Sequence, residues 1–295
     1  MAVAYVMVFT HDEAVGVDMS GPAATDFIDR AENPDSLRVT IASLYRYREL
    51  LRNLVTKDLK LKYRGSVLGF LWSLGNPLML IFVYTLAFKY ILRVGNDRFV
   101  LLLLLGVLAW TFFANSMMMA TGSIVDNAAL VKSVFFPRAI LPAASVFFNL
   151  AQYLLTLVVF LPAMLVVFGV RPATPMLLYP VFLLLQVMFT VGAALLIGSG
   201  TAFYRDVRHF VEVALMLLFW LTPIVYRLEQ VPSRLRPIVF LSPMSPFVVA
   251  YQRMFYDVRW PEPSVWIACV AYAAGTFAVG TMVFLATEHR LVEQV

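Results

Sequence analysis

The chain has 295 residues, of which 61% are hydrophobic and only 14% are charged, whereas about a quarter of the residues in an ordinary soluble domain are charged. This composition excludes a soluble globular protein, because the apolar residues gather in runs long enough to cross about 30 Å of hydrocarbon. The formal net charge of +5 gives no nucleic-acid signal, since in a membrane protein a basic excess normally marks cytoplasmic flanks and contact with anionic lipid.

The N-terminal segment, residues 1–39, has the composition of a mobile acidic tail. Its first 35 residues carry seven acidic side chains and a single basic one, Arg30. The apolar run 3–9 is too short to span a membrane and has no basic segment before it, so it predicts neither a signal peptide nor an anchor. We expect the N-terminus to stay in the cytoplasm.

Residues 40–66 predict an amphipathic helix at the surface of the inner leaflet. At 100° per residue, Leu44, Leu51 and Leu54 fall on one face and polar side chains on the other. A basic cluster follows just before the first apolar run, as in helices that bind anionic headgroups. The alternative is a solvated helix packed on a partner protein. The cluster consists of Lys57, Lys60, Lys62 and Arg64.

Six apolar segments predict membrane-spanning helices, so the fold of residues 67–292 is expected to be an all-α polytopic membrane domain. Six crossings return the chain to its starting side, and the excess of Lys and Arg there favours a cytoplasmic C-terminus. Asn76–Pro77 and Thr222–Pro223 would place a kinking proline inside the first and fifth spans. The predicted spans are 67–90, 99–122, 140–168, 176–203, 210–226 and 264–287.

The segment 227–263 is not an ordinary solvated loop. Its apolar stretches, such as 247–256, are interrupted by prolines that prevent one continuous helix. We therefore expect two short re-entrant helices between spans five and six, shielded from lipid by the other spans.

Ionisable groups are almost absent from the predicted spans. Residues 67–88, 139–170, 172–204 and 263–287 contain no Asp, Glu, Lys or Arg, whereas an ion-coupled carrier needs such groups at membrane depth. The sequence has no phosphate-binding G-x-x-x-x-G-K-[ST] motif, so the chain is not expected to hydrolyse ATP or to be an enzyme. One cysteine and three scattered histidines predict no metal site.

Aromatic side chains are what the spans carry instead. Aromatic faces stack on the C–H faces of sugars, so an aromatic lining would let a long glycan slide. The competing interpretation is ordinary interfacial anchoring and packing. The candidate glycan-channel residues are Phe70, Trp72, Tyr84, Phe88, Trp110, Phe219, Trp220 and Tyr226.

A cytoplasmic segment, residues 126–138, differs in kind from the other connections. Asp126 or Asn127 can cap a short helix that Pro137 ends. Apolar side chains stand here beside Lys132 and Arg138, outside the bilayer. The pattern suits docking into a groove of a partner protein, and the alternative is an interfacial membrane helix.

Four segments together carry a family resemblance that covers about residues 40–292. They read KDLKLKYRGSVLGFLWSLGNPL from Lys57, NAALVKSVFFPRAILP from Asn127, FYRDV from Phe203 and LSPMSPFVVAYQRMFYD from Leu241. On these segments the chain resembles the membrane subunit of ABC-2 type polysaccharide exporters, the family of O-antigen, capsule and teichoic acid permeases. It departs at Ser242-Pro243, where many relatives have Asn-Pro, and in its longer N-terminal tail.

The resemblance implies an exporter that moves a lipid-linked polysaccharide out of the cytoplasm across the bacterial inner membrane. Two copies of the chain would form the pore as a homodimer. Two copies of a separate ABC ATPase subunit would hold ATP and Mg²⁺, and this chain itself would hold no cofactor. The substrate would be a polyprenyl-pyrophosphate-linked glycan. The alternatives are an ABC-2 exporter of a small hydrophobic molecule or a lipid, and a membrane scaffold without transport.

The resemblance also implies roles for individual residues. A coupling helix and the FYRDV turn would contact the ATPase, the basic helix would form a gate that attracts pyrophosphate, and re-entrant helices at 235–256 would cap the channel outside. The coupling residues are Asn127, Leu130, Lys132, Phe135, Phe136, Pro137, Arg138, Tyr204, Arg205 and Asp206. The gate residues are Lys57, Lys60, Lys62, Tyr63 and Arg64.

Overall fold

The computed structural model describes residues 7–10, 13–16, 46–65, 71–93, 98–133 and 136–294. Within the N-terminal segment, two short strands, β1 (Met7–Thr10) and β2 (Glu13–Gly16), pair as an antiparallel hairpin. The remainder of the predicted acidic tail lies outside the described residues, as do Phe70 and Phe135 of the candidate sites.

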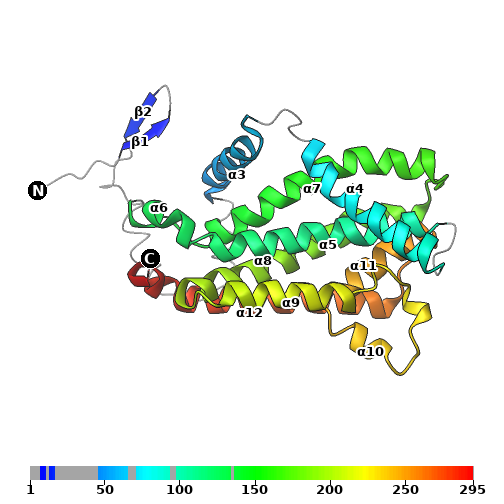
Figure 1. Ribbon diagram of the computed structural model, residues 1–295. Helices are drawn as coiled ribbons and strands as arrows, with labels where there is room; N and C mark the ends of the chain where they lie inside the picture. The colour runs from blue at the N-terminus through cyan, green and yellow to red at the C-terminus, as the bar shows by residue number, and fades with distance from the viewer. Residues whose placement is uncertain are drawn as a thin grey trace, which may run out of the picture.

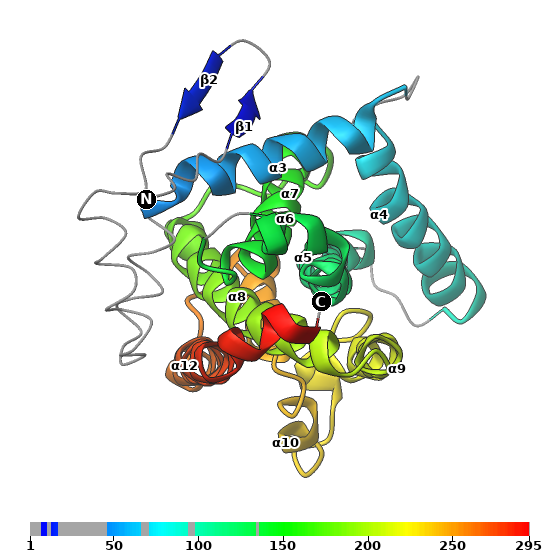
Figure 2. The same ribbon diagram turned by 90° about the vertical axis from the view of Figure 1, so that its left-hand side faces the viewer.

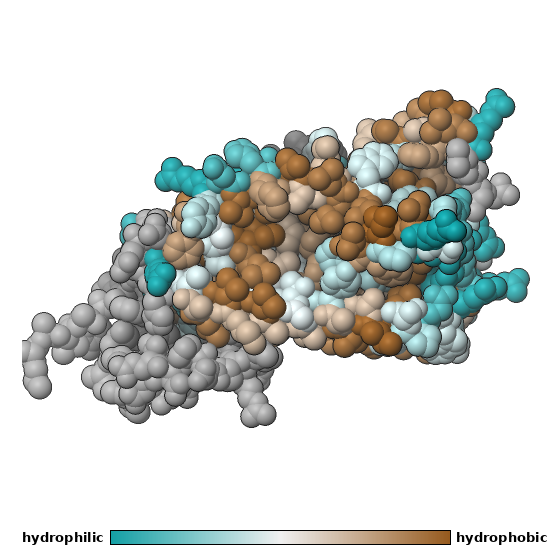
Figure 3. Space-filling model, turned by 90° about the horizontal axis from the view of Figure 1, so that it is seen from below, coloured by the Kyte–Doolittle hydropathy of each residue, from teal (hydrophilic) through white to brown (hydrophobic). Residues whose placement is uncertain are grey.

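Long apolar helices form the body of the molecule and run side by side (Figure 1). Within the described ranges, five helical stretches are long and apolar enough to cross a membrane. A helix closes its backbone hydrogen bonds internally, which is the condition for lying in hydrocarbon. Figure 3 shows hydrophobic side chains across the middle of one face and hydrophilic ones at its ends. The prediction of an all-α multi-pass membrane body is therefore confirmed.

Five helical units contain these stretches. Four of them keep close to the predicted boundaries, and the last runs on beyond its predicted end at residue 287. The units are α4 (Leu71–Tyr84) continued by the π-helix η1 (Thr85–Ile91), α5 (Phe99–Gly122), α7 (Ile140–Val167), the 3-10 helix η3 (Thr174–Leu178) followed by α8 (Tyr179–Phe203), and α12 (Pro263–Gln294).

Helix α5 lies inside the bundle. It packs against α4, α7, α8 and α9 (Val207–Leu221), and Figure 2 shows it among them when the bundle is viewed end-on. Of its membrane-length stretch, 78% is buried, against 17% for that of α4. Because α5 is hydrophobic on all sides, its place is the core of the bundle, and α4 is left on the outside.

The fifth predicted span differs from the structure. The prediction runs over 210–226, whereas α9 ends at Leu221, and Thr222 has an extended ψ of 135°. Thr222 takes the extended conformation that a following proline favours, so Thr222-Pro223 ends the helix rather than kinking it, whereas Pro77 stays inside α4. At 15 residues, α9 is about 22 Å long and shorter than the hydrocarbon core. It is therefore not among the five membrane-length stretches.

Short helices occupy the two ends of the bundle. At the end that holds the C-terminus lie α3 (Arg48–Tyr63) and α6 (Ala128–Ser133), which follows the 3-10 turn η2 (Val125–Asn127) (Figure 1).

The opposite end holds the short helices of the segment 227–263. All seven residues of α11 are buried, whereas α10 is largely exposed. The elements are η4 (Leu228–Gln230), α10 (Arg236–Val239), α11 (Ser245–Tyr251) and the π-helix η5 (Gln252–Tyr256).

Candidate functional site

The predicted gate helix is α3, and the predicted coupling segment is residues 126–138. The two meet in one hydrophobic cluster. Leu54 of α3 is buried together with Val131 of α6 and Phe136, against the first turns of α7. Tyr47, Leu50 and Leu51 complete the face of α3 that packs here. The apolar face of α3 is thus covered by the chain's own residues, and α3, α6 and the start of α7 share one cluster.

This packing determines which part of the coupling segment stays accessible. Phe136 is buried and Leu130 is half-buried, so these apolar side chains face the molecule. The amide of Asn127 donates to the backbone O of Ser123 at 2.9 Å and fixes the turn before α6. The accessible surface is formed by Val125, Asp126, Ala129 and Lys132.

Arg138 has a partner that lies 150 residues away in the sequence. Its backbone N–H donates to Glu288 Oε1 at 2.8 Å, and its Nη1 donates to the backbone O of Glu288 at 3.0 Å. Glu288 was not among the residues predicted from the sequence. No local pattern marks it, because the contact depends on where the last helix ends.

The second predicted ATPase contact, the turn between α8 and α9, is open at the surface. Tyr204, Arg205 and Asp206 are all exposed. The backbone N–H of Phe210 donates to the backbone O of Asp206 at 3.1 Å, which starts α9. Three adjacent exposed side chains at the turn between two helices can serve as a contact surface for another protein.

Most basic residues of the gate helix are exposed, but Lys62 is anchored. Its ammonium group donates to Gln152 Oε1 on α7 and lies 5.7 Å from the centroid of the Phe148 ring. Partial burial lowers the pKa of this ammonium group. Lys57, Lys60, Lys62 and Arg64 are all exposed and Tyr63 is half-buried. Because Lys62 is engaged by Gln152, the cationic surface that a phosphate would meet consists mainly of the other three.

Several predicted channel aromatics gather in one cluster between α4, α5 and α9. Tyr84 stacks on Phe219 with ring centroids 5.8 Å apart, and Phe219 meets Trp110 edge-on at 5.6 Å. Phe88 touches Tyr84, and Trp220 touches Phe219. These rings pack on one another within a single chain and form an aromatic wall between the three helices.

Two further aromatic candidates lie outside this cluster. Trp72 is 65% exposed on the outer side of α4. Tyr226 lies after the end of α9. Its hydroxyl group donates to the backbone O of Leu221, the last residue of that helix, at 2.7 Å. The sequence prediction grouped eight aromatics, and the structure brings five of them together.

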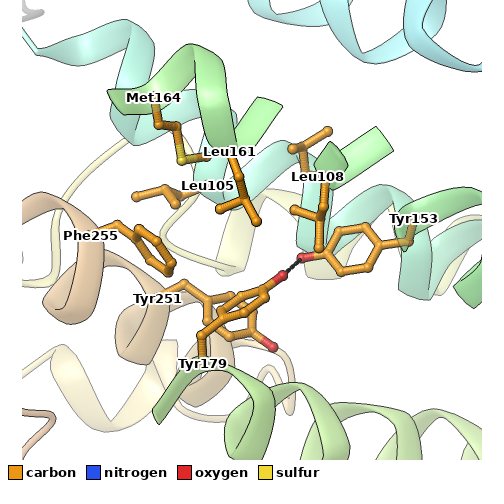
Figure 4. A pocket seen from close by; sticks show the side chains of 9 residues that line it. Leu105, Leu108, Tyr153, Leu161, Met164, Tyr179, Tyr251 and Phe255 are labelled. Atoms are coloured by element: carbon orange, nitrogen blue, oxygen red, sulfur yellow. Dashed lines mark hydrogen bonds between the residues drawn. The ribbon is translucent and has the colours of Figure 1, made fainter. Parts of the chain in front are cut away.

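A small cavity within the single chain is far too narrow for a glycan. Its volume of about 10 Å³ has room for about one water molecule. Tyr153 and Tyr179 share a hydrogen bond of 2.7 Å beside it, as Figure 4 shows. Tyr251 donates to Gln186 Oε1 at 2.6 Å.

Charged side chains hold together the end of the molecule opposite to α6. Asp257 accepts from Arg227 at 2.7 Å and from Arg253 at 2.8 Å, and Arg253 also reaches Glu229 and Glu262. These five residues, the outer clasp, connect η4, η5 and the start of α12. Sequence reasoning did not identify them, since their pairing depends on the fold of the whole segment.

The outer clasp shifts the ionisation of its own members. Burial alone would raise the pKa of Glu229, but a backbone hydrogen bond and the charges of Arg253 and Arg227 outweigh burial and lower it. The neighbouring carboxylates raise the pKa of Arg253 despite its burial. Within the described ranges, no three His, Cys, Asp or Glu side chains gather to hold a metal ion.

Comparison with known proteins gives consistent matches. Residues 49–256 match the family model of the ABC-2 type transporter. The chain is 32% identical over 260 residues to an O-antigen export system permease protein RfbA of Myxococcus xanthus, a match that covers 86% of this chain and 98% of the relative. An RfbA protein of Klebsiella pneumoniae is 33% identical over 210 residues, which cover 71% of this chain and 81% of the relative. The chain therefore belongs to the ABC-2 type transporter family.

Proposed function

We propose that the chain is the membrane subunit of an ATP-driven exporter that moves a lipid-linked polysaccharide from the cytoplasm across the inner membrane. The observation that carries this proposal is the match to an O-antigen export permease over 98% of that relative's length. The family model, which matches residues 49–256, includes nearly all of α3, all of α6 and most of the segment 227–263.

The energy source in this proposal is an ABC ATPase subunit in two copies, which binds ATP and Mg²⁺. Its contact surfaces on this chain are the accessible part of the coupling segment, around Asp126 and Lys132, and the exposed turn Tyr204–Asp206. What supports this assignment is that α6 shares its hydrophobic cluster with α3. Movement imposed on α6 by nucleotide binding would therefore reach the gate helix through this shared cluster and the start of α7.

The transport path in this proposal is completed by a second copy of the chain. Large apolar side chains on the outer sides of α4 and α9, among them Met79 and Phe210, are more than 60% exposed. Lipid or another copy must cover them. The wall of Tyr84, Phe219 and Trp110 lies between these two helices, so pairing through them would place the aromatic cluster beside the path.

The gate in this proposal is the cationic surface of α3. Lys57, Lys60 and Arg64 are exposed beside the first membrane helix, and clustered cations favour a pyrophosphate group or anionic headgroups. Lys62, which is held by Gln152, fixes the helix against α7. Helices α10 and α11 would close the path at the outer end.

The test is co-purification from the native membrane followed by reconstitution. The tagged chain is isolated in lipid nanodiscs, and ATP hydrolysis is measured with and without a polyprenyl-pyrophosphate glycan. We expect a bound ABC ATPase whose turnover rises with the glycan. Stimulation only by lipids or small hydrophobic compounds would favour an exporter of those molecules, and the absence of any bound ATPase would refute the proposal.

A further inference from the structure

Arg138 and Glu288 form a crossed pair of hydrogen bonds between the coupling segment and the end of α12. Each charged side chain bonds a backbone group of the other residue, at 2.8 and 3.0 Å. Both residues are half-buried. Hydrogen bonds that involve an ionised group are about twice as strong as neutral ones, so this pair is a firm joint between two distant parts of the chain.

Helix α12, which carries Glu288, also packs closely against α8. A Cβ atom added at Gly192 would lie 2.5 Å from the backbone N of Phe277, and one added at Gly280 would overlap the carbonyl group of Gly192. The two helices thus touch backbone to backbone. Because closely packed interfaces transmit displacement rather than absorb it, α8 and α12 move as one unit.

Helix α8 leads directly into the turn Tyr204–Asp206, the second candidate contact for the ATPase. The pair Arg138–Glu288 therefore joins the coupling segment to α12, and α12 joins it to α8 and that turn. A tight contact near Gly198, where an added Cβ would lie 2.8 Å from Pro142 Cγ, supports the same arrangement. Both candidate ATPase contacts belong to one rigid platform.

We propose that Glu288 is a positioning residue for energy coupling. Its carboxylate holds the backbone of Arg138, so that movement of the coupling segment is passed to α12 and the bundle. The inference rests on the proposed function, because it assumes an ATPase that moves this segment. It goes beyond that function by giving the end of the last helix a defined part in coupling.

The geometry determines which substitutions of Glu288 should keep the hydrogen bond to Arg138 and which should break it. The carboxylate bonds a backbone N–H rather than the guanidinium group of Arg138, so the reach of the side chain matters more than its charge. Glu288→Gln keeps an acceptor oxygen at the same distance. Glu288→Asp keeps the charge but is one methylene shorter. Arg290→Ala is the matched control, since Arg290 is exposed on the same part of α12.

The experiment compares these variants in proteoliposomes that contain the chain and its ATPase. Export of a fluorescent polyprenyl-pyrophosphate oligosaccharide and ATP hydrolysis are measured together. We expect Glu288→Asp to lower export per ATP hydrolysed by about tenfold, the order expected for losing a charge-assisted hydrogen bond. Glu288→Gln should stay within about threefold of wild type, and Arg290→Ala should match wild type. ATPase binding and basal hydrolysis should persist in all three.

The reverse order, with Glu288→Gln impaired and Glu288→Asp unimpaired, would overturn the proposal, because it would show that charge alone matters. Equal export by Glu288→Gln and Glu288→Asp would also overturn the proposal, because the reach of the side chain would then have no effect. Loss of ATPase binding or of thermal stability in parallel with export would assign Glu288 a merely structural role. Failure of the wild-type chain to bind an ATPase would instead refute the proposed function, so the two failures are distinguishable.

Discussion

Two glycines bring the backbones of α8 and α12 into direct contact. Gly192 faces the backbone of Phe277, and Gly280 faces the carbonyl group of Gly192. In a membrane, helices associate through close packing of small residues, since lipid tails are as apolar as the side chains. The absence of a side chain at these two positions is therefore what lets the backbones of this helix pair touch.

We predict that Gly280→Ala destabilises the protein by about 1–3 kcal/mol, because the added methyl group forces the two backbones apart. The matched control is Gly275→Ala on the same helix, where an added Cβ meets nothing within 4 Å. This control should be neutral or slightly stabilising, since alanine favours helix. Thermal unfolding of the purified variants in detergent measures both. Equal midpoints for the two variants would contradict the packing argument.

At the scale of elements, the outer clasp explains how short helices persist at one end of the bundle. Helix α10 has four residues and α11 has seven, which is too few for a stable isolated helix. Arg253 ties η5 to Glu229 after α9 and to Glu262 before α12. The segment is thus held at both of its ends by ion pairs in which Arg253 is 14% exposed and the carboxylates of Glu229 and Glu262 are exposed at the surface.

The stability that Glu229 contributes should depend on pH in a defined direction. Its pKa in the folded chain is lowered from an ordinary 4.5, so the folded state favours the ionised form. This stabilising contribution is fully present at a pH above the ordinary pKa of the carboxyl group. It is lost as the pH falls through the lowered pKa of the folded state. The thermal midpoint of Glu229→Gln should therefore lie below that of wild type at neutral pH, and the gap should close in acid.

The measurement is a series of thermal melts between about pH 7 and pH 3, a range that includes the ordinary carboxyl pKa. Glu212→Gln is the control, because Glu212 is about as exposed as Glu229 but pairs at 3.7 Å with Arg208, which is 59% exposed, whereas Arg253 is 14% exposed. Pairs of that kind contribute little to stability. A gap between wild type and Glu229→Gln that stays constant into acid would show that the carboxylate does not contribute through its charge.

Aromatic contacts at this scale also refine the channel hypothesis. Tyr84 is stacked on Phe219 and touches Phe88, so its removal would disturb helix packing as well as any glycan contact. Trp72 is mostly exposed on α4 and does not take part in that cluster. Trp72 is therefore the cleaner position at which to separate a role in transport from a role in packing.

At the scale of the whole molecule, local patterns predicted what local physics determines. The spans within α4, α5, α7, α8 and α12 follow from long apolar runs, and the amphipathic face of α3 follows from periodicity. The end of α9 at Thr222 had a local signal, the following proline, which the sequence analysis interpreted as a kink. A proline preceded by an extended residue stops a helix, but Pro77 lies inside α4, so the presence of a proline does not by itself distinguish a kink from a helix end.

Pairs between distant residues left no such signal. Arg138 and Glu288 are 150 residues apart, and Arg227 and Asp257 are 30 apart. Helical and strand periodicity relate only residues a few positions apart, so they could not reveal either pair. Likewise, the sequence pattern identified the apolar residues of the coupling segment, but not whether their side chains point toward a partner protein or into the chain itself. Whether Leu130 and Phe136 face a partner or the chain itself depends on where α3 lies, and that position is a property of the tertiary fold.

The number of crossings is the remaining question at this scale, and α9 decides it. This helix is too short by about 8 Å for a typical bilayer core, but a short span can be accommodated by local thinning of the bilayer. Figure 1 shows α10 at the end of the bundle opposite to α6. The chain between α9 and α10 therefore reaches the far side, and we expect six crossings with both termini in the cytoplasm.

Cysteine labelling tests this topology directly, because the only native cysteine, Cys269, is buried. An impermeant maleimide should label Arg234→Cys in intact spheroplasts, but Lys132→Cys and Arg205→Cys only after the membrane is permeabilised. Wild type should stay unlabelled in both conditions. Labelling of Arg234→Cys on the same side as Arg205→Cys would mean that α9 does not cross. The C-terminus would then lie outside, and Glu288 could not support a cytoplasmic coupling segment.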